Sequence, residues 1–145
     1  LHTDFRDFAA TADQRFHTIV SNPPFFREDT AGGSAGRDLA RRQEALPFGA
    51  LLAGVDRLLH PEGIFSLILP WRESAGFADR ASACGMHPIK ITSVQSRPGR
   101  PAKRAMLAFG RKKVRPEQES LCIATEGGGY SPAFRKLTAA FYLNL

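Results

Sequence analysis

The sequence predicts a mixed α/β fold, because short apolar runs typical of strands alternate with longer segments in which apolar residues recur at helical spacing. The first run, Phe16–Ser21, is rich in β-branched residues, and the second, Ile64–Pro70, is almost continuously apolar. The segment between them contains a helical repeat of apolar residues. With 145 residues, 43% of them hydrophobic and 23% charged, the chain has the composition of one globular domain or of part of one.

The first predicted strand ends at Asn22, because the two residues that follow are prolines, which have a fixed φ and no backbone N–H. Residues 27–45 are polar and contain the stretch AGGSAG, so we expect a mobile loop there. Pro47 then suits the first turn of a helix that His60–Gly63 would end. Six apolar residues form one face of this helix: Phe48, Leu51, Leu52, Val55, Leu58 and Leu59.

The strand Ile64–Pro70 is expected to be covered on both faces, as in a parallel sheet, because it contains almost no polar residue. A second helix follows over Ser74–Cys84, and Gly85 is well placed to end it. Two further strands, His87–Gln95 and Arg104–Lys112, are joined by a link too short for a parallel crossover. This link predicts an antiparallel pair at one edge of the sheet.

The C-terminal part predicts a small added strand over Leu121–Thr125 and a terminal helix. Ser131 is a good N-cap residue and Pro132 a good first-turn residue for that helix. Three apolar residues share one of its faces: Phe134, Leu137 and Phe141. We therefore expect residues 1–145 to form a single partial domain, an α/β sheet with an antiparallel edge pair and a C-terminal helix.

The formal net charge of the chain is +6, and the positive charge is concentrated in one segment. Eight basic residues and no Asp or Glu lie between Arg97 and Arg115. A basic face of this kind suits a polyanion such as nucleic acid. The alternative is a solvated surface that keeps the protein soluble.

No apolar run approaches the roughly 18 residues of a membrane-spanning helix, and the first residues lack the apolar core of a signal peptide. The two cysteines, Cys84 and Cys122, have no cysteine or histidine near them at metal-ligand spacing. We therefore expect a cytoplasmic monomer that holds no metal and binds no membrane.

The four residues Asn22–Phe25 combine two hydrogen-bond acceptors with a flat apolar ring at the end of a strand, where ligands bind in open α/β sheets. Because Pro23 and Pro24 fix the backbone, the Asn22 amide oxygen and the Pro23 carbonyl can together accept both hydrogens of an –NH₂ group. Such acceptors aim the lone pair of an aromatic amine and stabilise the positive charge that develops when it attacks an electrophilic methyl group. Phe25 can stack on a base that has been flipped out. The alternative is a merely rigid turn.

The segment TIVSNPPFF resembles the fourth motif of the class I S-adenosylmethionine-dependent methyltransferases that methylate amino groups through an N-P-P-[FY] sequence. This resemblance implies a Rossmann-like class I sheet as the fold and S-adenosyl-L-methionine as the cofactor. It also implies that Asn22, Pro23, Pro24 and Phe25 are catalytic residues, with Asn22 also contacting the cofactor.

The segment LHTDFRDFAA resembles the motif that follows the preceding strand in the same family. This resemblance implies that Asp4 binds the adenine amino group of the cofactor and that Phe5 lies beside the adenine ring. Asp7 is a second candidate for this acidic residue. An ordinary turn or cap residue is the alternative role of Asp4.

A more specific resemblance, to the tRNA (adenine-N6)-methyltransferases that act on adenine 37 of a valine tRNA, covers essentially the whole chain. Four segments carry it: FHTIVSNPPFF, RDLARRQEALPFGALLAGVDRLLHPEGIFSLILP, RPAKRAMLAFGRK and YSPAFRKLTAAFYLNL. It implies methylation of an adenine N6 in tRNA. The glycine-rich cofactor loop and the ribose-binding acidic residue of this family precede Asp4 and are absent from the sequence, so the chain resembles the C-terminal half of such an enzyme. We expect it to bind the cofactor poorly and to be inactive alone.

Seven basic residues are candidates for contacts with RNA phosphates. They are Arg37, Arg41 and Arg42, in the predicted loop of residues 27–45 on the substrate side, and Arg97, Arg100, Lys103 and Arg104, in the basic segment. A solvated surface is the alternative for both groups. Trp71 follows the strand Ile64–Pro70 and could line the pocket, although a half-buried core position is favoured for it.

Other functions remain open at this point. A DNA adenine-N6 or an rRNA guanine-N2 methyltransferase would use the same asparagine chemistry, whereas a protein-glutamine methyltransferase would leave the basic segment unexplained. The chain could instead be a non-catalytic RNA-binding unit. Replacement of Asn22 by Ala separates catalysis from binding, because only a catalytic role predicts lost turnover with RNA binding largely kept.

Overall fold

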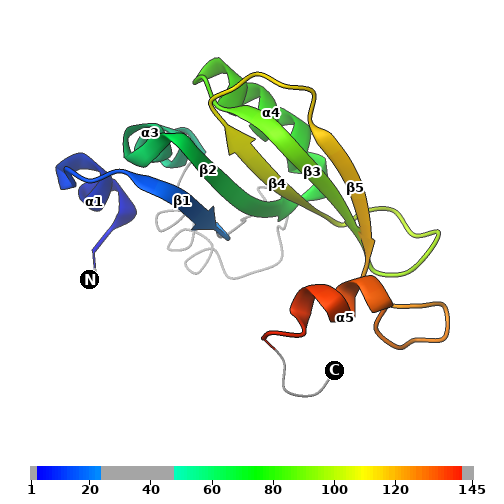
Figure 1. Cartoon of the computed structure of the whole chain (residues 1–145). Coiled ribbons are helices and arrows are strands. Elements are labelled where there is room, and N and C mark those ends of the chain that lie inside the picture. The colour runs from blue at the N-terminus through cyan, green and yellow to red at the C-terminus, as the bar shows by residue number, and fades with distance from the viewer. Residues whose placement is uncertain (1–2, 24–47, 142–145) are drawn as a thin grey trace, which may run out of the picture.

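The computed structural model describes residues 3–23 and 48–141, and this part of the chain forms a five-stranded sheet packed against helices (Figure 1). The strands are β1 (Phe16–Ser21), β2 (Leu59–Pro70), β3 (His87–Gln95), β4 (Arg104–Gly110) and β5 (Glu117–Cys122). The helices are α1 (Phe5–Thr11), α3 (Phe48–Leu58), α4 (Ser74–Ala83), α5 (Pro132–Thr138) and the short 3₁₀ helix η1 (Trp71–Glu73). The predicted α/β fold is confirmed.

The strand order across the sheet is β1-β2-β4-β3-β5. Strand β4 runs antiparallel to both of its neighbours, β2 and β3, whereas β1–β2 and β3–β5 are parallel pairs. The predicted antiparallel pair is therefore confirmed, and β5 extends the sheet beyond it. As a result β1, β2, β3 and β5 all end at the side of the sheet where β4 begins. We call this side the carboxyl end of the sheet, and the opposite side, where β4 ends at Gly110, the amino end.

Strand β2 begins earlier than the sequence predicts. Helix α3 ends at Leu58, and the four residues His60–Gly63, expected to terminate the helix, belong to β2 instead. They form an irregularity in the pairing with β1, because the register passes from Phe16–Leu59 directly to Thr18–Ile64. The Pro-Glu-Gly sequence looks like a helix stop, but parallel pairing with β1, which is non-local, places it in the strand.

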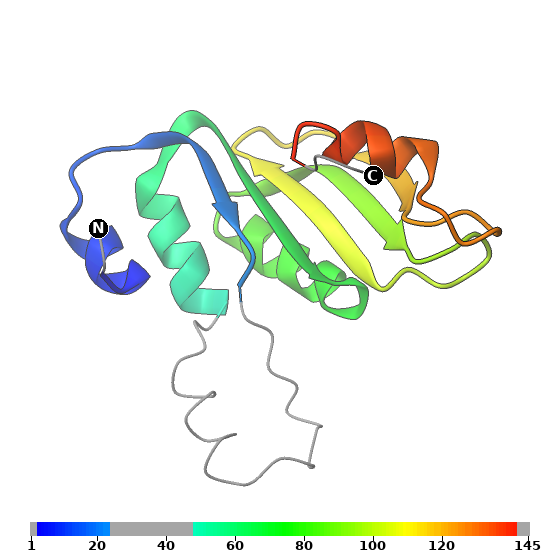
Figure 2. The same cartoon turned by 90° about the horizontal axis from the view of Figure 1, so that it is seen from below.

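Helices α3 and α4 cover one face of the sheet, and the core lies between them and the strands (Figure 2). The rings of Phe65 on β2 and Phe109 on β4 lie 6.1 Å apart, and Phe77 of α4 lies 5.7 Å from Phe109. All three side chains are fully buried. Burial of each such side chain stabilises the fold by about 1.5–3 kcal/mol. Helix α1 packs mainly against α3, and its Phe8 ring lies 6.2 Å from the ring of Phe16 in β1.

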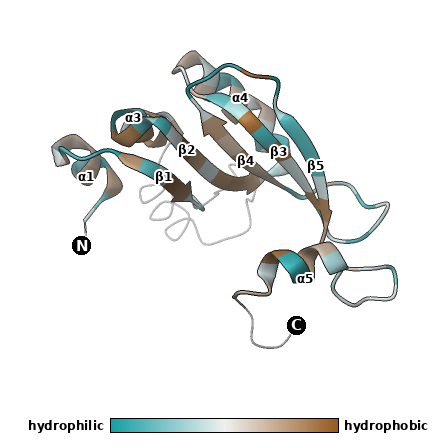
Figure 3. Ribbon diagram, viewed as in Figure 1, coloured by the Kyte–Doolittle hydropathy of each residue, from teal (hydrophilic) through white to brown (hydrophobic). Residues whose placement is uncertain are grey.

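The other face of the sheet is only half covered by the described residues, which corrects the prediction that Ile64–Pro70 is covered on both faces. Phe65, Leu67 and Leu69 are buried, whereas Ile64 is 42% exposed. Strand β1 lies at one edge of the described sheet, and its Val20 is 74% exposed. Figure 3 shows that most of β4 and the later part of β2 are hydrophobic, whereas β5 is largely hydrophilic. An apolar run therefore indicates a strand but not the number of faces that are covered.

The predicted ends of the remaining elements are largely confirmed. Gly85, with a φ of +74°, follows α4, and the Ser131 hydroxyl caps α5 by accepting the backbone N–H of Phe134 at 3.1 Å. Strand β5 begins at Glu117, four residues before the predicted start. Helix α5 ends before Phe141, so this ring does not continue the apolar face of the helix and is 85% exposed. None of the described helices is long and apolar enough to cross a membrane.

Candidate functional site

Segments that are far apart in the sequence meet at the carboxyl end of the sheet. Asn22 follows β1, Trp71 follows β2, Arg97 follows β3, and Lys103 and Arg104 lead into β4. The register places them side by side, since β1 pairs with β2, β2 with β4, and β4 with β3 at this end. Ligands of open α/β sheets bind beyond the carboxyl ends of the strands, so this end is the candidate site.

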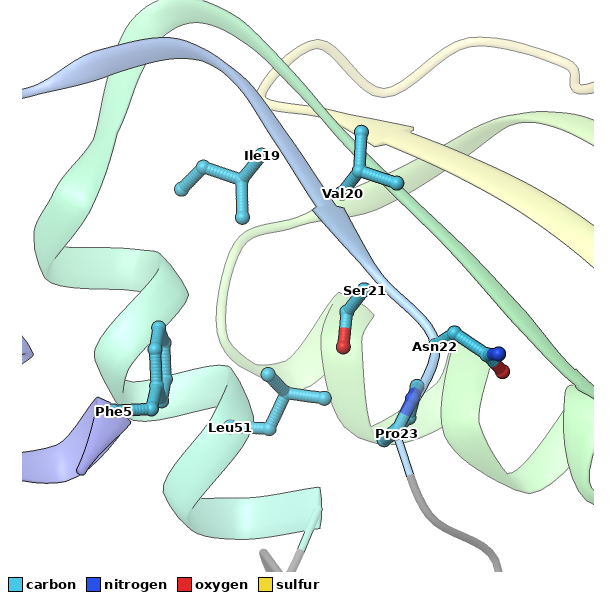
Figure 4. A pocket seen from close by; sticks show the side chains of 7 residues that line it. All are labelled: Phe5, Ile19, Val20, Ser21, Asn22, Pro23 and Leu51. Carbon is cyan, nitrogen blue, oxygen red and sulfur yellow. The ribbon is translucent and has the colours of Figure 1, made fainter. Parts of the chain in front are cut away.

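A pocket of about 230 Å³ opens beside the end of β1 (Figure 4). Phe5 of α1 and Leu51 of α3 form one side of it. The complete lining is Phe5, Ile19, Val20, Ser21, Asn22, Pro23 and Leu51. Sites for complete small-molecule ligands generally measure about 300–1,000 Å³. The pocket therefore has room for one ring system rather than for a whole nucleoside with an amino acid attached.

Asn22 is exposed, whereas the adjacent Pro23 is buried. Alternate residues of a strand point to opposite faces. Accordingly Ile19 and Ser21 face the helices, and the Asn22 amide points away from Phe5 (Figure 4). The end of β1 can thus contact one ligand in the pocket and a second ligand on its outer side, as a two-substrate reaction requires.

Phe5 is held in the pocket wall by its contact with α3. A Cβ atom on Gly54 would lie 2.4 Å from Phe5 Cε1 and 3.1 Å from the Ala9 Cβ, so only glycine permits this approach of α1 to α3. The sequence reasoning missed Gly54, Leu51, Ile19 and Ser21 as parts of the site. A glycine inside an amphipathic helix costs about 1 kcal/mol relative to alanine, and this unfavourable choice was the available signal for a close contact.

Asp4 is the N-cap of α1, which is the alternative role that the sequence left open. Its Oδ1 accepts the Arg6 backbone N–H at 2.7 Å and Nε–H at 3.0 Å, and its Oδ2 accepts Nη2–H at 2.9 Å. The side-chain and backbone hydrogen bonds from Arg6 lower the pKa of Asp4 to about 2, so the carboxylate is ionised at neutral pH. Oδ2 keeps one lone pair for a further donor. Asp7 is exposed in the first turn of the same helix.

The eight basic residues between Arg97 and Arg115 fall into two groups at opposite ends of β4. Strand β4 separates them, so the second group lies beyond the amino end of the sheet, about 20 Å from Arg104 for a strand of this length. The first group, at the carboxyl end, is Arg97, Arg100, Lys103 and Arg104, and the second is Arg111, Lys112, Lys113 and Arg115.

The two groups also differ in their partners. Arg97, Arg100, Lys103 and Arg104 are all exposed, and none of them forms an ion pair with a carboxylate of the described residues. In the second group, the Arg111 guanidinium is paired with the Asp56 carboxylate of α3, whereas Lys112, Lys113 and Arg115 are exposed and form no ion pair within the described part of the chain. Four exposed cations without an ion-pair partner among the described residues therefore lie at the carboxyl end of the sheet, the same end as Asn22.

Trp71 is 41% exposed, which corrects the favoured core position. It is placed at the surface because β2 ends at Pro70 and η1 begins directly after it.

Several predicted site residues lie outside the described residues, namely Pro24, Phe25, Arg37, Arg41, Arg42 and the loop of residues 27–45. Among the described residues, no cluster of three or more His, Cys, Asp and Glu side chains is placed to hold a metal ion.

A solved structure shares this fold. The chain superposes on a predicted O-methyltransferase from Agrobacterium tumefaciens with a TM-score of 0.66 and 20% sequence identity, over 96% of this chain and 58% of that protein. The fold is therefore that of the class I methyltransferases, with the carboxyl end of the sheet as its ligand side.

Sequence identity to known proteins gives a more specific comparison than the fold. It is 38% identical over 144 residues to the tRNA1(Val) (adenine(37)-N6)-methyltransferase of Flavobacterium psychrophilum, and 38% identical over 145 residues to the protein of the same name from Flavobacterium johnsoniae. Each match covers 99% of this chain and 62% of the relative. No family model matches the chain. The chain is a homologue of these methyltransferases, which confirms the resemblance, and it spans 62% of their length.

Proposed function

We propose that the chain forms the substrate side of an enzyme that transfers a methyl group from S-adenosyl-L-methionine to the N6 amino group of an adenine in tRNA. The expected base is adenine 37 of tRNA1(Val), the base in the names of the relatives. The observation that carries the proposal is the exposed Asn22 amide at the end of β1, beside the pocket and pointing away from Phe5. The unpaired cations at the same end of the sheet support an RNA substrate.

The residues present fit part of the cofactor, which supplies an electrophilic methyl group when it is bound. Phe5 and Leu51 offer apolar surface to a ring, and the Ser21 hydroxyl adds a polar group. The ionised Asp4 carboxylate, next to Phe5 in the chain, is the acceptor for an amino group. Because the pocket measures only about 230 Å³, we expect the chain by itself to bind the cofactor weakly and to transfer no methyl group.

Asn22 and its neighbours act on the amino group of the substrate. Asn22 Oδ1 and the Pro23 carbonyl each accept one of its hydrogens, which holds the nitrogen in place and aims its lone pair. The same two oxygens stabilise the positive charge that develops on nitrogen, and no strong base is needed before transfer. In this proposal Pro24 keeps the turn rigid and Phe25 stacks on the flipped base.

The test is Asn22→Ala in the full-length enzyme. We expect kcat for methyl transfer to tRNA to fall by about 10²–10³, as for the loss of one preorganised hydrogen-bonding group, while the Kd for tRNA changes by less than about threefold. Thr18→Ala, an exposed polar residue of the same strand, is the matched control and should leave both quantities unchanged.

Two outcomes would contradict the proposal. Equal losses of turnover and of tRNA binding in Asn22→Ala would favour a non-catalytic RNA-binding role. Faster methylation of duplex DNA or of rRNA than of tRNA by the unmodified enzyme would assign another nucleic acid as the substrate.

We further infer a monomer that acts in the cytoplasm and needs no metal. Light scattering would test the oligomeric state, and an assay in the presence of a chelator would test the need for a metal.

A further inference from the structure

We infer that Trp71 is a stacking platform for a second nucleobase of the RNA, adjacent to the base that is methylated, and that Arg97, Arg100 and Lys103 bind the phosphates beside it. The inference rests on the proposed function, which supplies an RNA substrate. It assigns a base-binding site to a residue outside the Asn22–Phe25 motif.

The backbone around Trp71 is held by the end of β2 and by three neighbouring segments. The Trp71 N–H donates to the Lys103 carbonyl at 3.0 Å, and the Lys103 N–H donates to the Val94 carbonyl at 2.9 Å. The Ser74 hydroxyl donates to the Trp71 carbonyl at 2.6 Å. Since β2, β3, the segment before β4 and the start of α4 all hold this point, the indole is attached to a rigid support.

The indole itself is available to a ligand. It is 41% exposed, whereas the large aromatic side chains Phe65, Phe77 and Phe109 are fully buried. Among residues 3–23 and 48–141 the indole ring takes part in no ring–ring contact, and the indole Nε1–H donates no hydrogen bond. A rigidly attached, exposed aromatic ring without a partner is what single-stranded nucleic acids use as a stacking surface.

The charges around Trp71 specify the kind of partner. Lys103 is hydrogen-bonded to Trp71 through the backbone, and Arg97 and Arg100 lie in the turn after β3, joined by an Arg100 N–H to Arg97 carbonyl bond of 3.2 Å. All three side chains are exposed, and none forms an ion pair with a residue in the described ranges 3–23 and 48–141. The nearest acid in sequence, Glu73, is neutralised by Arg72 at 3.2 Å. Cations interleaved with an exposed aromatic ring match a nucleic acid strand, which offers phosphates and bases in alternation.

The distance between Asn22 and Trp71 indicates that Trp71 contacts a second nucleotide rather than the methylated base. Ser21 pairs with Leu67, so Asn22 lies level with Ile68 on β2. Pro70, the last residue of β2, lies two residues beyond Ile68, and Trp71 follows it as the first residue of η1, so Trp71 lies about 10 Å further on at roughly 3.3 Å per residue. A base whose amino group is bound at Asn22 and a base stacked on Trp71 are therefore two different nucleotides of the strand.

The experiment compares Trp71→Ala and Trp71→Phe in the full-length enzyme, with an unmodified tRNA1(Val) transcript as the probe. We expect Trp71→Ala to raise the KM for tRNA by about tenfold or more, with kcat within about threefold, and Trp71→Phe to retain most of the affinity because it keeps a ring. Val114→Ala is the control, since Val114 is 50% exposed and lies beyond the amino end of the sheet. Circular dichroism verifies that each variant is folded.

Fluorescence gives a second readout that does not depend on methyl transfer. Trp71 is the only tryptophan of the 145 residues, and the difference between wild type and Trp71→Phe isolates its emission in the full-length enzyme. We expect saturating tRNA to quench this emission, because a stacked base quenches an indole. Unchanged emission, or a wild-type KM in Trp71→Ala, would overturn the inference while Asn22→Ala could still support the proposed function. Quenching without any methyl transfer would leave the platform standing and overturn the proposed function.

Discussion

Strand β4 has basic residues at both of its ends, but the two ends are built differently. Beside Arg104, the cations are exposed, have no carboxylate partner among residues 3–23 and 48–141, and share the carboxyl end of the sheet with Asn22. Beyond Gly110, Arg111 binds the Asp56 carboxylate and donates to the Asp56 backbone carbonyl at 2.8 Å, which fastens the chain to α3. Charges that are close in the sequence can thus have separate roles. Arg111 has a structural role through its pairing, whereas position at the carboxyl end of the sheet separates Arg97, Arg100 and Lys103 from the exposed cations beyond Gly110.

The largest expected effect concerns the pocket beside the carboxyl end. Gly54→Ala should be less stable than Gly49→Ala by about 1–3 kcal/mol, because the new methyl group at position 54 overlaps Phe5 Cε1, whereas nothing lies within 4 Å of one at position 49. Both residues belong to α3, so the gain in helix propensity cancels in the comparison.

Urea unfolding of the two variants measures this difference, and cofactor titration should show weaker binding only for Gly54→Ala, as Phe5 is displaced. Equal stability of the two variants would mean that Phe5 is not held against Gly54. It would remove the structural link between α3 and the pocket.

A smaller effect is expected at the amino end. Arg111→Ala should destabilise the protein by about 1 kcal/mol or less, because it removes a partly exposed ion pair and one hydrogen bond. The Kd for tRNA should stay within twofold of the wild-type value, as it should for the neighbouring exposed Lys112→Ala control. A loss of tRNA affinity as large as that of Lys103→Ala would show that both ends of β4 contact RNA.

The smallest effect concerns Asp4, which is paired yet lies beside the pocket. Arg6→Ala should raise the pKa of Asp4 from about 2 toward its ordinary value, because the side-chain hydrogen bonds from Arg6 are lost while the backbone bond remains. Folding lowers the pKa of Asp4. Its contribution to stability is therefore fully present when the pH is above the ordinary pKa of the unfolded chain, and it is lost as the pH falls toward 2. A carboxyl NMR titration measures the shift, and an unchanged pKa in Arg6→Ala would contradict this assignment.

Local patterns were sufficient for much of the fold. Phe16–Ser21 and His87–Gln95 have the bounds that their sequence predicts, as do the glycine after α4 and the Ser131 cap. The site motif at Asn22 was also readable, because two prolines must end the strand there. Its chemical role, like those of Asp4 and the basic residues, stays a prediction.

What the sequence could not provide depends on contacts between distant segments. The separation of the two basic groups follows from the position of β4 between β2 and β3, which no local pattern encodes. The strand assignment of His60–Gly63 depends on β1, and the exposure of Trp71 depends on where β2 ends. The contact between Gly54 and Phe5 likewise needs the packing of α1 on α3.

The central claim is that RNA binds at the carboxyl end of the sheet and not at the amino end, and two matched triple variants test it most directly. Arg97, Arg100 and Lys103 are changed to Gln in one, and Lys112, Lys113 and Arg115 in the other, so both lose three positive charges. For the first, we predict a tRNA affinity at least about tenfold weaker and a salt dependence with a slope reduced by about 2–3. For the second, we predict a nearly unchanged affinity. Equal losses in the two variants would contradict the account.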